Sequence, residues 1–450
     1  MKKILFLIAV LATLIGCKKT SYVAVFEKTP QERAGEQIAL VSSTLTSATN
    51  GWIATLPTLA GGGYSFYITF DNQQNTTMYG DLTDQSASVV GTSNYRVKQD
   101  IGTELIFDTY NYISMLDDPS AAILGGASKI GYSSDIEFTY DRMSGDSIVF
   151  IGKKYRQPFK LVKATAAQKT AYEAAGLKTS MDKIKAFFAN IKNPYVEVAD
   201  GGNTLKAGMS LNFTNNLAAG KRVSFTGVLS DGTSTASGTS KFAFKLDGAD
   251  LLGSGLVYNG VTFVKMGWKD ATTLAFYDNT GKEYIIKSSP IPLTPLSLLF
   301  GFPTTFPYKK ITIPTSGLAT GVTSGFNATY NQMLALFTAS GRSVVSTTFS
   351  LASNTTFSVA VAYMSGTSAF TATVNFNYTR NGDVITLDNI PVVTSDNNWT
   401  TRAVQVKPLA DYIISGPFKI DWVSSTNPNS PTLGGLYRTA DASSFIYGTL

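Results

Sequence analysis

Three segments of the chain carry apolar residues at helical spacing. In the first, Thr29-Pro30-Gln31-Glu32 combines a threonine N-cap, a proline at the first helical position and a glutamate three residues after the cap, which is the pattern of a capping box. Ile38, Val41 and Leu45 follow on one face, and Asn50-Gly51 ends the run. This pattern predicts an amphipathic helix that starts after Thr29 and stops before Asn50.

Two further helices are predicted by the same spacing. The second starts at Thr179, has Asp182 three residues on and ends at Asn193-Pro194, and the third runs from about Ser324 to Gly341. An alanine-rich stretch from Ala164 to Gly176 predicts a helical connector before the second helix. We expect the buried faces to be Ile184, Phe187 or Phe188, and Ile191 in the second helix, and Phe326, Tyr330, Met333 and Phe337 in the third.

Each helix is followed by a stretch in which apolar and polar residues alternate, as in a strand with one buried face. A turn with asparagine comes next, then the tripeptide Gly-Thr-Ser and another strand, and each unit ends in a hairpin with an acidic turn residue. The tripeptides begin at Gly91, Gly238 and Gly366, and the last hairpins turn at Gly145-Asp146, Lys269-Asp270 and Gly382-Asp383.

The order of these elements predicts an α+β fold, mainly antiparallel β, with three related helix-plus-β-meander units in tandem. Each helix would cover the apolar face of its own sheet. The alternative is that small meanders look alike in a chain rich in Ser, Thr and Gly. The predicted units are residues 17–163 with an insertion, residues 164–320 with connector helices and a Pro-rich linker over residues 290–314, and residues 321–450. From Asp411 onward we expect strand and loop.

Composition removes several classes of function. Of the 450 residues 15% are charged and none is histidine, so serine-histidine triads and histidine-zinc sites are excluded. We therefore expect no catalytic residues, no metal ligands and no cofactor. The net charge of +6 includes Lys2 and Lys3, and the remaining lysines are scattered, which argues against binding to nucleic acid.

The first residues have the pattern of an export signal. Lys2 and Lys3 precede an apolar stretch, Ile4–Ile15, that is shorter than the roughly 20 residues needed to span a bilayer as a helix. Leu14-Ile15-Gly16-Cys17 resembles a bacterial lipobox, and Cys17 is the only cysteine. We expect residues 1–16 to be removed and Cys17 to carry a lipid, palmitate included, that anchors the protein to the outer membrane. Lys18 and Lys19 replace the acidic residues typical of surface export, which favours the periplasmic side over the cell surface.

The first predicted unit resembles a family of Bacteroidetes lipoproteins catalogued as domain of unknown function 4302. The residues that carry the resemblance cover about a third of the chain: Phe26, Thr29-Pro30, Arg33, Gly51-Trp52, Gly63-Tyr64, Phe66, Phe70-Asp71, Ser93-Asn94-Tyr95, the segment from Phe107 to Asn111, Asp135, Glu137 and Phe138. Ser133-Ser134 stands where the family often has glycines. No activity is established for the family. Members resemble accessory lipoproteins encoded beside outer-membrane uptake systems, which implies a glycan or peptide as ligand and uptake proteins as partners.

Two acidic arrangements offer candidate chemistry. Asp135 and Glu137 would share a face of an alternating strand, where two carboxylates could serve a glycoside hydrolase, or could equally be ion-pair partners on the sheet surface. Asp117-Asp118-Pro119 offers carboxylates to calcium, but an aspartate before proline is also an ordinary turn. We favour the structural interpretation for both.

A ligand surface is predicted on the insertion between Phe107 and Asp135. Tyr110 and Tyr112 would share one face of an extended strand and offer a stacking platform, with Asp117 and Asp118 as acceptors for hydroxyl groups. The competing interpretation is that Phe107 and Tyr110 fill the core and that the insertion is a lid without a ligand. The sequence thus favours a non-catalytic accessory binding module, with a carboxylate-dependent hydrolase or a structural, adhesive subunit of the envelope as alternatives.

Overall fold

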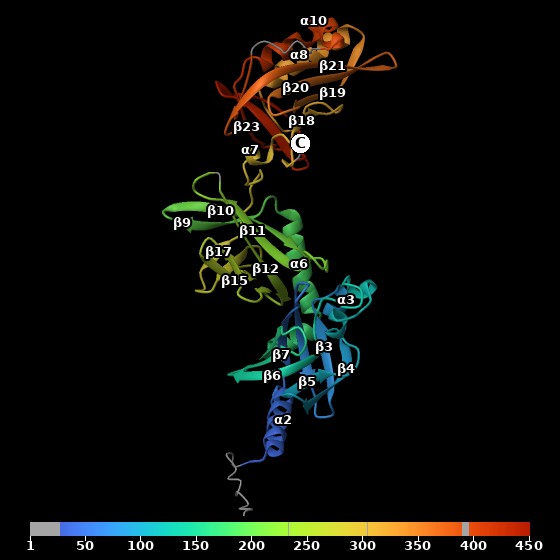
Figure 1. Cartoon of the computed structure of the whole chain (residues 1–450), viewed down its shortest axis with the longest axis vertical. Coiled ribbons are helices and arrows are strands. Elements are labelled where there is room, and N and C mark those ends of the chain that lie inside the picture. The colour runs from blue at the N-terminus through green and yellow to red at the C-terminus, as the bar shows by residue number, and fades with distance from the viewer. Residues whose placement is uncertain (1–27, 233, 304, 389–395) are drawn as a thin grey trace, which may run out of the picture.

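Three β units are stacked along the long axis of the molecule in the computed structural model (Figure 1). The structure describes residues 28–450 except residues 233, 304 and 389–395. The predicted signal segment, the predicted lipid attachment at Cys17, and Phe26 therefore lie outside the described residues. Among the residues described, no helix has both the length and the apolar character needed to cross a membrane.

The first unit begins with helix α2 (Pro30–Ser47), which has the predicted capping box at Thr29 and buries Val41 and Leu45. Eight antiparallel strands follow and close into a barrel through the pairing of β1 with β8. The helix packs over β2, β4 and β5. The strands are β1 (Trp52–Pro57), β2 (Gly63–Phe70), β3 (Asn75–Gly80), β4 (Gly91–Gln99), β5 (Thr103–Phe107), β6 (Glu137–Ser144), β7 (Ser147–Gly152) and β8 (Pro158–Lys163).

Aromatic side chains fill the interior of this barrel. Phe107, Phe138 and Phe159 are buried and contact one another with ring centroids 4.6–6.3 Å apart, because alternate residues of each strand point inward. Three short helices interrupt the strands: α3 (Asp84–Ser88) between β3 and β4, and η1 (Ser114–Leu116) and α4 (Ala121–Leu124) in the predicted insertion between β5 and β6.

The second unit has the predicted connector and helix, α5 (Ala166–Glu173) and α6 (Gly176–Asn190), which begins three residues before Thr179. Its nine-stranded antiparallel sheet has its ends, β9 and β17, joined by an isolated bridge between Tyr195 and Lys287 with N···O distances of 2.9 and 2.8 Å. The strands are β9 (Tyr195–Asp200), β10 (Asn203–Asn212), β11 (Arg222–Val228), β12 (Thr235–Lys245), β13 (Gly248–Leu251), β14 (Leu256–Tyr258), β15 (Val261–Trp268), β16 (Leu274–Asp278) and β17 (Glu283–Ile285).

The third unit is a second closed barrel of eight antiparallel strands. Helix α8 (Phe326–Ala339) buries the four side chains that the sequence predicted, Phe326, Tyr330, Met333 and Phe337. The strands are β18 (Lys310–Ile313), β19 (Arg342–Leu351), β20 (Thr356–Ser365), β21 (Ser368–Asn381), β22 (Val384–Leu387), β23 (Phe418–Val423), β24 (Leu433–Arg438) and β25 (Asp441–Thr449), and the other helices are α7 (Leu296–Leu299), α9 (Asn397–Thr401) and α10 (Ala403–Ile413).

The predicted fold class, mainly antiparallel β with three similar sheets, is confirmed. The three Gly-Thr-Ser tripeptides also fall at corresponding places, since each lies at or in the fourth strand of its unit. Gly91 opens β4, Gly238 lies inside β12 and Gly366 stands in the turn before β21.

Two differences from the prediction concern the third unit. Its barrel starts before residue 321, because β18 pairs with both β19 and β25 and so belongs to it, although its sequence lies in the stretch predicted to be linker. The prediction of strand and loop from Asp411 is wrong at its start, because α10 extends to Ile413. Pro408 lies inside that helix, where proline normally breaks the hydrogen-bond ladder, and burial of Leu409 and Ile413 offsets this cost.

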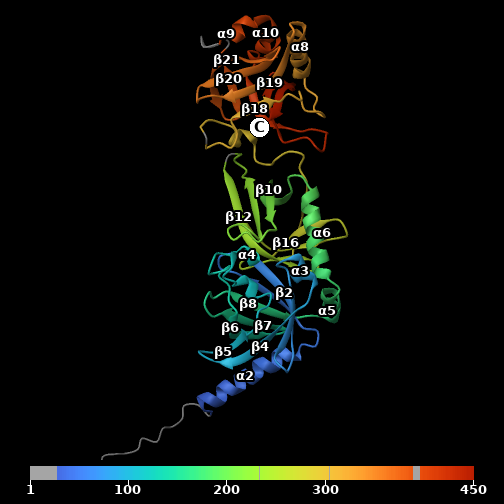
Figure 2. The same ribbon diagram turned by 90° about the vertical axis from the view of Figure 1, so that its right-hand side faces the viewer.

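The first two units pack closely against each other, and the third is joined to them by the linker. Figure 2 shows α6 running along the second sheet towards α3 of the first barrel. Strand β2 of the first barrel also contacts β12. The linker chain is held by the third barrel, because the guanidinium of Arg380 donates to the carbonyl oxygens of Ser297 and Phe300, the latter at 2.7 Å.

Candidate functional site

The structure brings two of the predicted ligand residues together. The Tyr110 hydroxyl donates a hydrogen bond to Asp118 Oδ2 at 2.7 Å, and 59% of Tyr110 is exposed. The interpretation in which Tyr110 fills the core is therefore wrong for this residue, whereas Phe107 is buried in the barrel. Burial, and then the hydrogen bond to Asp118, raise the pKa of Tyr110 to about 12.

Tyr112 does not share a face with Tyr110, because this segment is not the extended strand that was expected. Asn111 between them turns inward, donates to Ser93 Oγ at 3.1 Å and accepts from the Ser114 backbone N–H at 2.9 Å, which starts η1. The Tyr112 hydroxyl donates to the Val89 carbonyl at 3.0 Å. The two rings therefore form no stacking platform.

Asp117 and Asp118 also have separate environments. Asp117 is half-buried, and burial raises the pKa of its carboxyl group. Asp118 accepts from the Ser120 backbone N–H at 2.8 Å, so it has the turn geometry of an aspartate before proline. The hydrogen bond from Tyr110 lowers the pKa of Asp118 most. Within the described ranges, no group of three or more acidic or sulfur side chains is arranged to hold a metal ion.

Asp135 and Glu137 have separate partners. Both oxygens of the Asp135 carboxylate accept backbone N–H groups, from Lys154 at 2.7 Å and from Tyr155 at 3.0 Å, so Asp135 fixes the turn after β7. Glu137 accepts instead from the Lys153 ammonium at 2.9 Å.

Lys153 is the centre of an acidic cluster on the outside of the first barrel. Its ammonium lies 2.7 Å from Asp100, 3.1 Å from Glu104 and 2.9 Å from Glu137. The hydrogen bond to Asp100, followed by those to Glu137 and Glu104, raises the pKa of Lys153. Because the ammonium already occupies the space between the carboxylates, this cluster ties β5, β6 and β7 together.

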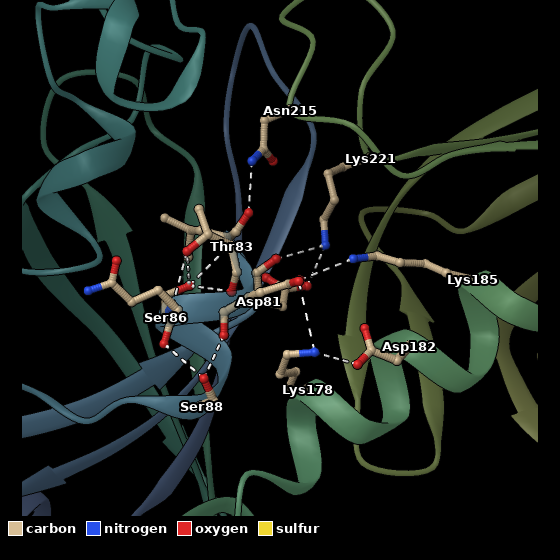
Figure 3. Close-up of polar contacts among 12 residues, drawn as sticks. Asp81, Thr83, Ser86, Ser88, Lys178, Asp182, Lys185, Asn215 and Lys221 are labelled. Carbon is tan, nitrogen blue, oxygen red and sulfur yellow. Dashed lines mark hydrogen bonds and ion pairs between the residues drawn. The ribbon is translucent and has the colours of Figure 1, made fainter.

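The contact between the first two units is built around an enclosed ion pair (Figure 3). Asp81 follows β3, Lys221 precedes β11, and their side chains are 0% and 1% exposed with Nζ···Oδ2 at 2.5 Å. Asp81 also accepts the backbone N–H groups of Ser65 at 2.9 Å and Phe244 at 2.7 Å. Burial lowers the pKa of Lys221, and the Asp81 carboxylate opposes that change.

A second set of contacts surrounds this pair. The Asn215 side-chain amide donates to the Leu82 carbonyl at 2.8 Å, and Asp84 lies 3.5 Å from Lys185 of α6 (Figure 3). The Tyr132 hydroxyl, from the insertion, bonds to the Asn215 carbonyl oxygen. The insertion thus contributes to the contact between units, which the sequence did not predict.

A cavity of about 350 Å³, which we call the junction cavity, lies between the second and third units. Tyr308 and Trp422 stack edge to face with ring centroids 6.1 Å apart, and the Trp422 Nε1–H donates to the Thr294 carbonyl at 2.7 Å. Hydroxyl-bearing and apolar side chains complete the lining. The lining residues are Asn193, Pro194, Gly208, Met209, Ser210, Ser224, Thr226, Pro292, Leu293, Thr294, Leu299, Tyr308, Trp422 and Thr432.

The sequence did not single out this cavity, because its walls come from three regions far apart in the chain. The linker was interpreted as a spacer, yet Leu293 forms part of the wall. A Cβ atom at Gly208 would lie 3.0 Å from the Leu293 Cδ1 atom, so the absence of a side chain lets the linker lie against β10. The usable signal was the clustering of prolines beside Leu293 and Tyr308.

One comparison with known proteins gives a match. A family model described as Domain of unknown function (DUF4302) matches residues 24–270, from before α2 to the turn after β15. The similarity therefore extends beyond the first unit, to which the sequence resemblance was confined. Searches of curated proteins and of solved structures gave no significant match.

Proposed function

The chain belongs to the DUF4302 family, whose model covers more than half of it, and we propose that it is a non-catalytic binding module of a bacterial outer membrane. Its ligand is a nutrient, a glycan or a peptide, and its partners are outer-membrane uptake proteins. Cys17 carries the lipid anchor after removal of residues 1–16. Lys18 and Lys19 support an orientation towards the periplasm.

The observation that carries this proposal is the cavity between the second and third units. Its volume of about 350 Å³ is within the range of small-molecule sites, and it combines two aromatic rings with several hydroxyl groups. In the described part of the chain, Ser210 Oγ and Thr226 Oγ1 have no hydrogen-bond partner, and both residues are exposed. Unengaged hydroxyl groups beside aromatic edges suit a polar ligand with apolar faces.

Hydrolysis by paired carboxylates finds less support. Such chemistry needs one carboxyl group free to give or take a proton and a second free to act on the substrate or on water. Asp135 is occupied by two backbone N–H groups and Glu137 by Lys153. None of the described residues that line the junction cavity is acidic.

The experiment is a screen of glycans and peptides against the full chain, followed by calorimetry with each hit. Thr226→Trp places a large side chain in the cavity, and Thr204→Trp is the matched control, because Thr204 is also exposed on β10 but lies outside the lining. Loss of binding in Thr226→Trp alone is the expected result. Equal binding by both variants, or cleavage of a hit that Asp135→Asn abolishes, would overturn the proposal.

A further inference from the structure

The outer face of β10 and β11 connects the junction cavity to the first barrel. Three hollows lie along it, and neighbouring hollows share residues. The junction cavity and the second hollow share Ser210 and Ser224, and the second and third hollows share Thr214 and Ala218. The third hollow ends at Leu124 and Gly125, beside α4 of the insertion. We call this continuous surface the β10–β11 groove.

The floor of the groove carries small polar side chains where β10 and β11 pair. Ser210 pairs across the strands with Ser224, and Gly208 with Thr226, in an antiparallel register. Inward residues of the same strands, such as Val223 and Phe225, are buried, so the partners in these pairs point outward. Between Gly208 and the end of β10 at Asn212 the strand advances about 13 Å at roughly 3.3 Å per residue.

Charge is almost absent from the lining. Among the described residues that line the three hollows, Arg222 alone carries a fixed charge, and none is Asp or Glu. The Arg222 guanidinium already donates to the carbonyl oxygens of Gly220, Ala60 and Gly61 at 3.1–3.3 Å. Because the guanidinium is held by the backbone and the rest of the lining has little charge, the groove suits an uncharged ligand.

Most of the backbone of the floor is also used. Strand β10 pairs with β11 over Gly208–Asn212 and with β9 over Asn203–Gly208, so within the floor only its last few residues leave a short edge on the β9 side to which an extended peptide could add as a strand. The side chains of the lining are hydroxyl and amide groups, the aromatic rings of Tyr308 and Trp422, and apolar groups such as Phe213. These groups match the hydroxyl groups and apolar ring faces of sugars.

We propose that the β10–β11 groove binds a neutral oligosaccharide in extended form, with one end in the junction cavity and the other against the insertion of the first unit. This inference rests on the proposed binding function and adds the class of ligand and its direction of binding. It also gives the insertion a role through Leu124 and Gly125, at the end of the groove, and not through Tyr110.

The test is calorimetry of the full chain with neutral gluco-, manno- and xylo-oligosaccharides from mono- to hexasaccharide, and with uronic acid oligosaccharides of the same lengths. We expect affinity in one neutral series to rise at least tenfold from the di- to the longest saccharide, and the acidic series to bind at least tenfold more weakly. Affinity that is independent of length, or stronger for the acidic series, would overturn the inference.

A variant separates this inference from the proposed function. Ala218→Trp fills the far part of the groove and leaves the junction cavity open, since Ala218 lines only the second and third hollows. Ala218→Trp should remove the gain in affinity of the long saccharides and leave the affinity of the short ones unchanged. Thr226→Trp should remove binding of long and short saccharides alike, and Thr204→Trp should change the binding of neither. If Ala218→Trp keeps the full gain, or if only peptides bind at the cavity, the groove inference fails while the binding function stands.

Discussion

Asp81 and Lys221 form an ion pair with no access to solvent, although 140 positions separate them in the chain. The pair joins a loop of the first barrel to the start of β11 in the second sheet. Three aromatic rings surround the ammonium, with Phe244 closest at 4.3 Å from Nζ to the ring centroid. The Asp81 carboxylate also accepts one backbone N–H group from each unit, that of Ser65 in the first and that of Phe244 in the second. This contact is thus the polar centre of their interface.

Removing one partner of this pair should destabilise the interface strongly. Lys221→Met leaves the Asp81 carboxylate buried without its counter-ion, and Asp81→Asn leaves the Lys221 ammonium buried without its own. Each change should lower the free energy of unfolding by about 3–5 kcal/mol. The double variant should cost less than the sum of the two, because it leaves no unpaired charge. Urea unfolding of all four proteins gives the coupling energy, and additive costs would contradict the interpretation.

The Lys153 cluster predicts an order of effects. Lys153→Met leaves three carboxylates facing one another, one of which, Glu104, is buried with its Oε1 atom unpartnered among the described residues. It should therefore lower the melting temperature more than Glu137→Gln, which leaves Lys153 bonded to Asp100 and Glu104. Differential scanning calorimetry measures both. A smaller effect of Lys153→Met would mean that the cluster contributes little to holding β5, β6 and β7.

The contact between Tyr110 and Asp118 should be confined to a definite pH window. Stability from the Tyr110 phenol is fully present below its ordinary pKa of 10.0 and is lost as the pH rises through about 12. Stability from the Asp118 carboxylate is present above its ordinary pKa of 3.8 and is lost as the pH falls through the lowered pKa.

Asp118→Asn should bring the pKa of Tyr110 part of the way back towards 10.0, since burial is the larger cause of the rise. The chain has 22 tyrosines, so the ultraviolet titration must be taken as a difference from Tyr110→Phe, which isolates one phenol. A pKa of Tyr110 that does not move in Asp118→Asn would show that the hydrogen bond is not formed in solution.

The proposed lipid anchor at Cys17 can be tested without a ligand. Cys17→Ala in a bacterial host should abolish incorporation of labelled fatty acid and release the protein from the membrane fraction. Its matched control is a substitution at Lys18 to alanine, which leaves the thiol in place. Labelling that persists in Cys17→Ala would contradict lipidation at this residue.

Local patterns predicted helices α2, α5, α6 and α8 and the turn of the hairpin expected at the end of each unit. The capping box at Thr29 and the stripe from Phe326 to Phe337 are local, since each depends on residues within a few turns of one helix. Helix α10 was missed because Pro408 signals a break that burial overrides. Local patterns could not predict that the barrels close, because the pairing of β1 with β8 joins residues more than a hundred positions apart.

The predicted ligand face failed for a similar reason. Tyr110 and Tyr112 share a face only if the segment is extended, and the inward turn of Asn111, which depends on Ser93 in another strand, decides that it is not. The Asp81–Lys221 pair has no local signature, and the clustered prolines beside Leu293 and Tyr308 do not by themselves indicate a cavity. Both depend on which units touch, and neither apolar spacing nor turn residues encode that.

The match to the family ends at residue 270, but the second sheet does not. Phe276 of β16 and Tyr284 of β17 lie in its core, with ring centroids 5.0 Å from Phe225 and 4.9 Å from Phe263, respectively. A protein cut at residue 270 would lack both and expose the rings they cover. The end of the family match is therefore not the end of the folded unit. A fragment that folds on its own must continue to Lys287, whose backbone joins the two ends of the sheet.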